Sequence, residues 1–371
     1  MARAKTLETE TIEADRLDGF PHPRETTAFI GHDAALAQLS AAIRSGRLHH
    51  AWLLSGPKGI GKATLAYRVA RALLKYGTGV NVPERLQLNE SDPVFRSIAA
   101  LTHPDLFVLR RPAMEDDPGR LKTVLPVDEV RKASAFFAKS AGEGGWRVCI
   151  VDSIDEMNAN AANALLKILE EPPPRALFLL ISHSPGRLLP TIRSRCQKLP
   201  MPELRDAEVM QLLAEQLPEL SGEERASAAK LAGGSIGRAL VVAHEDGLNS
   251  YREMVALLEK LPQVDIAELH ALGDRLARPN SDAVYVNFTE LLGEWLARMI
   301  SSLAASRPIS EAVPGESALM HRLFANASID QWMLVWENIN ALLAHAASVN
   351  LSRKQVIINI FSNLAQTAKG R

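Results

Sequence analysis

The first part of the chain, up to about residue 201, alternates short apolar runs with longer segments of helical periodicity. The apolar runs have the length and composition of buried strands and lie at 50–55, 105–109, 147–152 and 176–182. The periodic segments predict helices at 33–45, 63–75 and 157–171, and three prolines at 172–174 end the last of them. Strands that alternate with helices predict an α/β domain with a doubly wound, mostly parallel sheet. Such a sheet binds its ligands at the carboxyl ends of its strands.

After residue 201 the strand pattern stops and only helical periodicity remains. The expected helices include 204–216, 223–232, 235–244, 284–305 and 330–348. The pattern therefore divides the chain into four parts. We expect a flexible polar extension at 1–25, an α/β domain at 26–201, a small helical domain at 202–246 and an all-helical domain at 247–371.

Composition narrows the class of protein without identifying it. The 371 residues carry a formal charge of −1 and are 47% hydrophobic and 23% charged, which is typical of a soluble globular protein. A polybasic nucleic-acid binder is excluded, so any contact with DNA needs a local patch or a partner. Two cysteines give no disulfide framework and indicate a reducing cytoplasm. No apolar run approaches the roughly 20 residues of a membrane span, and the first residues lack the apolar segment of a signal sequence, so we expect neither.

The first candidate site is a glycine loop between the first strand and the following helix. Residues 56–63 read Gly-Pro-Lys-Gly-Ile-Gly-Lys-Ala, and Gly56, Gly59, Gly61 and Lys62 match a phosphate-binding P-loop. In that motif the lysine is followed by Ser or Thr, whose hydroxyl binds the Mg²⁺ of the nucleotide. Here Ala63 replaces this residue. Thr64 comes one position late, and on a helix it points about 100° away. The loop predicts an anion site that lacks one metal ligand.

The third apolar run ends in Asp152, where a P-loop enzyme holds the aspartate that coordinates Mg²⁺. Hydrolysing members of the AAA+ group commonly have a glutamate next, which activates the attacking water. This chain has Ser153 there, and a serine hydroxyl is a poor general base. Two parts of a hydrolytic site are therefore altered together.

A third motif makes the chain recognisable. Residues 191–196 read Thr-Ile-Arg-Ser-Arg-Cys, and residues 163–173 read Asn-Ala-Leu-Leu-Lys-Ile-Leu-Glu-Glu-Pro-Pro. With the P-loop, these segments resemble the clamp-loader branch of the AAA+ ATPases. The resemblance implies that Arg195 acts in trans, on ATP held by a neighbouring subunit. The planar, charged guanidinium of an arginine suits phosphate oxygens and neutralises charge that develops on the γ-phosphate.

The resemblance covers about residues 28–244 and assigns two further residues. Arg238, in Gly-Gly-Ser-Ile-Gly-Arg-Ala at 233–239, matches the arginine of the second sensor, and Ser182 is the expected first sensor. Residues 202–246 then correspond to the helical lid of the family, and residues 247–371 to its oligomerising collar. Many relatives bind zinc through four cysteines after the P-loop helix. The segment 74–110 has none here, so we expect no zinc.

The chain combines altered hydrolytic residues with an intact Arg195. In this combination it resembles the non-motor subunits of the bacterial DNA polymerase III clamp loader. This resemblance implies partnership with the motor subunits and the delta subunit. Through the complex it also implies partnership with the sliding clamp and primer–template DNA, but not with a membrane. We expect no intrinsic ATPase or polymerase activity, weak ATP binding at most and no firm Mg²⁺ site. One alternative is an active AAA+ ATPase, either a motor subunit or another remodeller, in which Thr64 supplies the hydroxyl. A P-loop nucleotide kinase is disfavoured because the helical C-terminus has no acceptor-site motif.

Overall fold

The structure is a computed structural model that describes residues 13–117, 119–138, 145–244, 247–279, 281–349 and 351–370. It divides into two compact units, one ending at Glu208 and the other beginning at Val209. The boundary lies inside the helix α7 (Asp206–Gln216). The expected boundary between the two C-terminal domains, at 246, stays a prediction.

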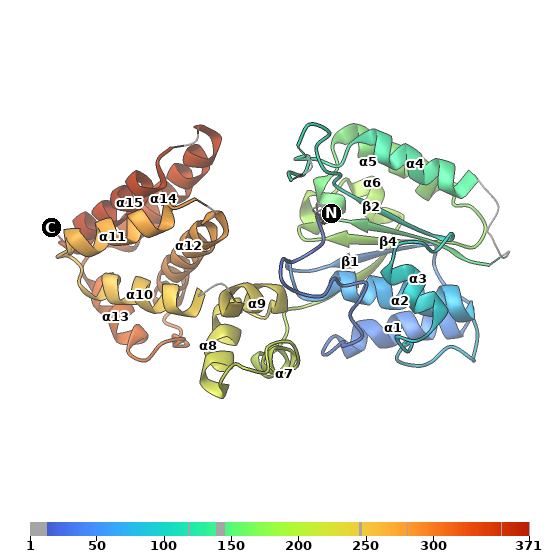
Figure 1. Cartoon of the computed structure of the whole chain (residues 1–371), viewed down its shortest axis with the longest axis horizontal. Helices are drawn as coiled ribbons and strands as arrows, with labels where there is room; N and C mark the ends of the chain where they lie inside the picture. Colours follow the sequence, from blue (N-terminus) through green and yellow to red (C-terminus); the bar gives the residue numbers. More distant parts are fainter. Residues whose placement is uncertain are drawn as a thin grey trace, which may run out of the picture. The chain divides into compact units, whose positions relative to one another are not determined.

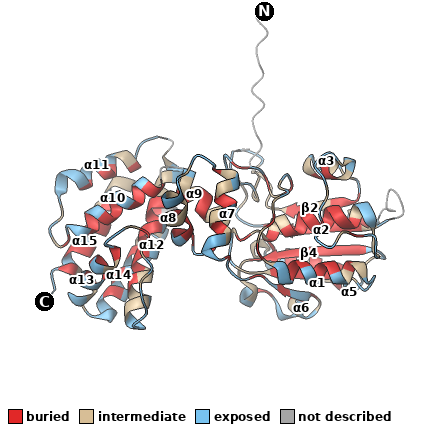
Figure 2. Ribbon diagram, turned by 90° about the horizontal axis from the view of Figure 1, so that it is seen from below, coloured by how far each residue is buried: buried red, intermediate tan, exposed pale blue. Residues whose placement is uncertain are grey.

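The first unit is built on a five-stranded sheet in the order β2-β3-β4-β1-β5, and every strand pairing is parallel (Figure 1). The strands are β1 (Ala51–Ser55), β2 (Leu106–Arg110), β3 (Arg147–Asp152), β4 (Ala176–Ser182) and β5 (Gln197–Pro200). The predicted α/β class is therefore confirmed. Figure 2 shows β4 buried along its length, as expected of a strand inside a sheet covered on both faces.

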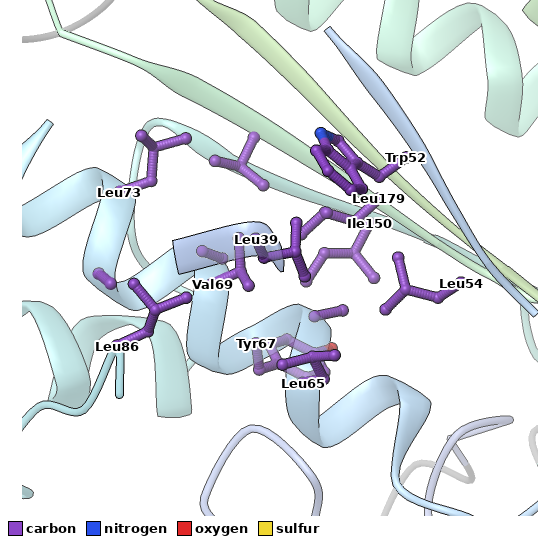
Figure 3. Packing of buried hydrophobic residues seen from close by; sticks show 14 of the residues in the cluster. Leu39, Trp52, Leu54, Leu65, Tyr67, Val69, Leu73, Leu86, Ile150 and Leu179 are labelled. Carbon is purple, nitrogen blue, oxygen red and sulfur yellow. The ribbon is translucent and has the colours of Figure 1, made fainter. Parts of the chain in front are cut away.

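Two layers of helices cover the sheet (Figure 1). One face packs against α1 (Asp33–Arg44), α2 (Lys62–Tyr76) and α3 (Pro93–Ala99), and the other against α4 (Val127–Ala138), α5 (Ala159–Glu170) and α6 (Pro190–Ser194). Successive strand residues point to opposite faces, so Trp52 and Leu54 of β1 join the first core while Ala51 and Leu53 join the second. Figure 3 shows the first core, in which Trp52, Tyr67 and Ile150 lie between the sheet and α2.

Most of the predicted elements match, and the differences have local causes. The helix α1 begins at Asp33, and its N-cap is His32, which has a left-handed conformation. The strand β5 was not predicted, since only Leu199 of its four residues is buried. The helices α3, α4 and α6 were not predicted either. Residues 77–92 contain no helix or strand.

The second unit is entirely helical among its described residues. It comprises the rest of α7, α8 (Gly222–Ala232), α9 (Ile236–His244), α10 (Gly247–Glu259), α11 (Ile266–Leu276), α12 (Asp282–Ala304), α13 (Glu316–Ala325), α14 (Ile329–Val349) and α15 (Arg353–Ala368). Large buried side chains, among them Tyr251, Trp295 and Trp332, form its core. No helix in the described part of the chain is both long and apolar enough to cross a membrane.

Part of the expected flexible extension is packed against the first unit. Residues 1–12 lie outside the described residues, but His22 and the side chain of Asp15 are almost fully buried. Asp15 binds Arg110 at the end of β2, with 2.7 Å between Oδ1 and Nη1, and accepts a hydrogen bond from Tyr67 of α2. The prediction of a flexible segment is therefore wrong for residues 13–25. Ion pairs with distant residues leave no periodic pattern in a sequence, so the polar composition was misleading here.

Candidate functional site

The P-loop has the expected place between β1 and α2. Gly56 follows Ser55 of β1 and lies against the backbone of Met201. An added Cβ at Gly56 would lie 2.1 Å from the carbonyl oxygen of Met201. Gly61 is the N-cap of α2 and has a φ of 100°, which L side chains rarely adopt. Gly59 also has a positive φ. These positions require glycine, and they turn the first N–H groups of α2 toward the loop, where an anion can bind.

The P-loop lysine is turned into its own loop. Lys62 is 3% exposed, and its ammonium donates hydrogen bonds to the carbonyl oxygen of Gly56, 2.6 Å away, and to that of Pro57. Burial lowers the pKa of Lys62 to about 8, although the carboxylates of Asp152 and Asp155 oppose the shift. In this arrangement the loop carbonyls accept hydrogen bonds from N–H groups of Lys62 that would otherwise be free to bind a phosphate.

The position of the missing hydroxyl is apolar. Ala63 is partly buried and packs against the core between the sheet and α2. Thr64, the next residue of the helix, is also partly buried. The chain therefore presents a methyl group where a P-loop ATPase presents a Mg²⁺ ligand.

Asp152 ends β3 at the same edge of the sheet as the P-loop, as predicted. Burial and the nearby carboxylate of Asp15 raise the pKa of Asp152 to about 7, and Lys62 opposes this shift. Ser153 is 2% exposed, and its hydroxyl is buried without a hydrogen-bond partner among the described residues. A buried serine hydroxyl next to Asp152 cannot replace the glutamate that activates water.

The predicted first-sensor residue is engaged by an aspartate that the sequence did not single out. Ser182, at the end of β4, donates a hydrogen bond to Asp155, 2.8 Å away. Asp155 also accepts hydrogen bonds from the backbone N–H groups of His183 and Ser184. These contacts hold the end of β4 to the segment after β3. Because its hydroxyl proton points to Asp155, Ser182 has no proton to donate to a nucleotide.

The packed N-terminal segment lies beside this site and holds the one group of metal-like ligands found in the described ranges. Atoms of Glu13, Asp15 and His22 lie within 4.8 Å of one another. Arg110 pairs with both carboxylates, and Arg24 pairs with Glu13 at 2.7 Å. Two guanidinium groups thus balance the two carboxylates. With these charges already balanced by arginines, the cluster does not fit a metal ion.

Arg195 lies at the amino ends of the strands, whereas the P-loop lies at their carboxyl ends. It precedes Gln197 of β5, which pairs with Trp52 at the start of β1, whereas Gly56 follows the end of β1. The strand β1 has five residues, so at about 3.3 Å per residue the two ends lie roughly 16 Å apart. The Arg195 side chain is 34% exposed and forms an ion pair of 2.6 Å with Glu170. Arg195 therefore cannot serve the P-loop of its own chain.

The predicted second-sensor arginine belongs to the second unit. Arg238 lies in α9 and forms an ion pair with Glu294 of α12. Its Nε and Nη2 atoms are buried without hydrogen-bond partners among the described residues. Within this unit the side chain is held by a carboxylate. Its predicted contact with nucleotide stays a prediction.

A family model described as DNA polymerase III, delta subunit, matches residues 31–205. The match spans the sheet, the P-loop, Asp152 and Arg195, and it ends before Arg238. The chain is also similar to DNA polymerase III subunit delta' of Pseudomonas aeruginosa, with 38% identity over 59% of this chain, and of Escherichia coli, with 31% identity over 62%. It covers 63% and 65% of the lengths of these two curated relatives, which is less than two thirds of each.

Two further similarities extend over more of the chain. DNA polymerase III subunit tau of Escherichia coli is 27% identical over 80% of this chain and 45% of its own length. Among solved structures, a DNA polymerase III gamma subunit-related protein from Thermotoga maritima aligns with 90% of this chain and 99% of its own, at 19% identity and a TM-score of 0.42.

Proposed function

We propose, from the similarity to DNA polymerase III subunit delta', that the chain is a non-motor subunit of the clamp-loader complex of that polymerase. In this role it assists the ATP-dependent loading of the sliding clamp onto primed DNA during replication. Its direct partners are the delta subunit and the motor subunits, which correspond to the tau and gamma/tau relatives. The clamp and the primer–template DNA are reached through the assembled complex.

The observation that carries this proposal is the position of Arg195. Arg195 is partly exposed and lies at the end of the strands opposite its own P-loop, which supports a contact with nucleotide on another subunit. There its guanidinium would neutralise charge on the γ-phosphate as the phosphoryl group leaves, which is the contribution of an arginine supplied in trans. Arg195 is thus the proposed catalytic residue, and the ATP it serves belongs to a motor subunit.

The altered P-loop supports a chain that does not itself hydrolyse ATP. Lys62 is bonded to its own loop, Ala63 lacks the hydroxyl, and Ser153 replaces the water-activating glutamate. Gly56, Gly59 and Gly61 keep the backbone shape of an anion site, so weak ATP binding is retained in the proposal without a firm Mg²⁺ site. Asp152, Ser182, Thr64 and Arg238 are then remnants of a nucleotide site. We also propose that the chain binds no zinc and has no polymerase activity of its own.

Both cysteines support a place in the cytoplasm. Cys149 and Cys196 are free and buried, as in proteins of a reducing compartment, and burial raises the pKa of the Cys196 thiol to about 12.

Reconstitution tests the proposed function directly. The full chain is mixed with motor and delta subunits, and the assembly is purified by size exclusion. We expect the chain to enter the complex, and clamp- and DNA-stimulated ATP hydrolysis to depend on its presence. A chain that stays outside the complex, or a complex that is equally active without it, would contradict the proposal.

A further inference from the structure

Glu170 and Arg195 come from two elements that end at the same edge of the sheet. Glu170 is the last residue of α5, and Arg195 is the C-cap of the short helix α6. The distance from Oε1 of Glu170 to Nη2 of Arg195 is 2.6 Å. Glu170 is about half exposed and Arg195 about one third exposed, so both remain accessible from one side.

A second contact fixes the other amino group of the same guanidinium. Nη1 of Arg195 donates a hydrogen bond to the carbonyl oxygen of Thr191, 3.0 Å away, within α6. A guanidinium has five N–H donors in a fixed plane, and these two contacts use one donor on each amino group. Three donors are left for another acceptor. The carboxylate and the carbonyl therefore fix the plane of the guanidinium without using up its capacity to bind phosphate.

Stability alone does not account for this ion pair. Pairs between exposed side chains contribute little to folding, because solvent screens them and ordering two long side chains costs entropy. At a site of phosphoryl transfer, the same ordering affects the rate of the reaction. An arginine that is already oriented loses less freedom when it meets its acceptor, and small errors in placement have large effects on rate.

We propose that Glu170 is a positioning residue for Arg195, holding its guanidinium in the orientation that completes the ATP site of the neighbouring subunit. This inference rests on the proposed function, because it needs the trans role of Arg195. Glu170 touches no nucleotide in this account and acts only through Arg195. Removing its charge should therefore weaken an interaction made in the transition state, which lowers kcat more than it changes KM for ATP.

The test compares variants of the full chain in the reconstituted complex, with ATP as the varied substrate. We expect Glu170→Gln to lower kcat by roughly two- to fivefold with KM for ATP within about twofold of wild type. Glu170→Asp keeps the charge and should restore part of the rate. Glu171→Gln is the matched control, because it removes the same charge from the next, exposed residue, and it should behave as wild type.

The double variant separates positioning from an unrelated effect on the complex. If Glu170 acts only through Arg195, then Glu170→Gln has no further effect when Arg195 is already alanine. The inference would be overturned if Glu170→Gln had wild-type kinetics or changed only KM. It would also be overturned if Glu170→Gln lowered kcat equally in the wild-type chain and in Arg195→Ala. A loss with Arg195→Ala but none with Glu170→Gln would overturn this inference alone. No loss with either would overturn the trans role of Arg195 as well.

Discussion

The ammonium group of Lys62 lies 2.6 Å from the carbonyl oxygen of Gly56, so the P-loop lysine is bonded to the loop that it belongs to. In an active P-loop ATPase this lysine binds the nucleotide phosphates. Here it satisfies backbone carbonyls, beside a methyl group in place of the metal-binding hydroxyl. The phosphate site keeps its backbone shape, but the ammonium group of Lys62 is already bonded to the loop.

The isolated chain should therefore show no appreciable ATP hydrolysis. We expect the phosphate release measured with purified wild-type chain to equal that of Lys62→Ala, because the Mg²⁺-binding hydroxyl and the water-activating glutamate are both missing. The same variant should enter the reconstituted complex normally. Appreciable turnover that Lys62→Ala abolishes would favour the alternative of an active ATPase, with Thr64 supplying the missing hydroxyl.

The buried Asp15 should stabilise the first unit at neutral pH. Burial alone would raise the pKa of Asp15, but Nε2 of His22, 3.2 Å away, and the charge of Arg110 lower it to about 2. A lowered pKa stabilises the fold above the ordinary carboxyl pKa of about 4, and this stabilisation is lost as the pH falls toward 2. Asp15→Asn should therefore lower the free energy of unfolding by about 2 kcal/mol at pH 7.

Urea denaturation at a series of pH values measures this effect. The difference between wild type and Asp15→Asn should shrink between about pH 4 and pH 2. The control is Asp18→Asn, because Asp18 is an exposed carboxylate three residues away, and this change should stay within about 0.5 kcal/mol of wild type. A difference that is independent of pH would show that Asp15 contributes through something other than its charge.

Chelation should leave the fold unchanged. The segment that carries zinc in many relatives has no cysteine here, and arginines balance the carboxylates of Glu13 and Asp15. We expect the same midpoint of thermal unfolding with and without EDTA, and no zinc in the purified protein by elemental analysis. A loss of stability on chelation would reveal a structural metal.

The sequence predicted best the elements in which burial is uniform. Strands β3 and β4 match their predicted bounds, because continuous apolar runs end there in Asp152 and Ser182. The strand β5 and the packing of residues 13–25 were missed, since both depend on partners far away in the chain. The short β5 is held by pairing with β1, and Asp15 by Arg110, which lies 95 residues further along the chain.

The sequence proposes the residues of the candidate site but does not reveal their contacts. The P-loop and the strand end point to Lys62 and Asp152, and the resemblance to the family points to Arg195. The sequence did not reveal that Asp155 binds Ser182 or that Glu170 binds Arg195, because a motif gives residue types and spacing but not which side chains meet in space. Each pair joins the ends of elements that the parallel sheet brings together, so only the fold reveals them.

We propose that Arg195 completes the ATP site of a neighbouring subunit, and one substitution tests this role most directly. In the reconstituted complex, Arg195→Ala should lower clamp- and DNA-stimulated ATP hydrolysis by at least roughly fivefold while size exclusion shows unchanged assembly. The matched control is Arg193→Ala, which removes a partly exposed arginine from the same short helix and should leave the rate unchanged. Wild-type ATP hydrolysis by a fully assembled complex that carries Arg195→Ala would contradict the account.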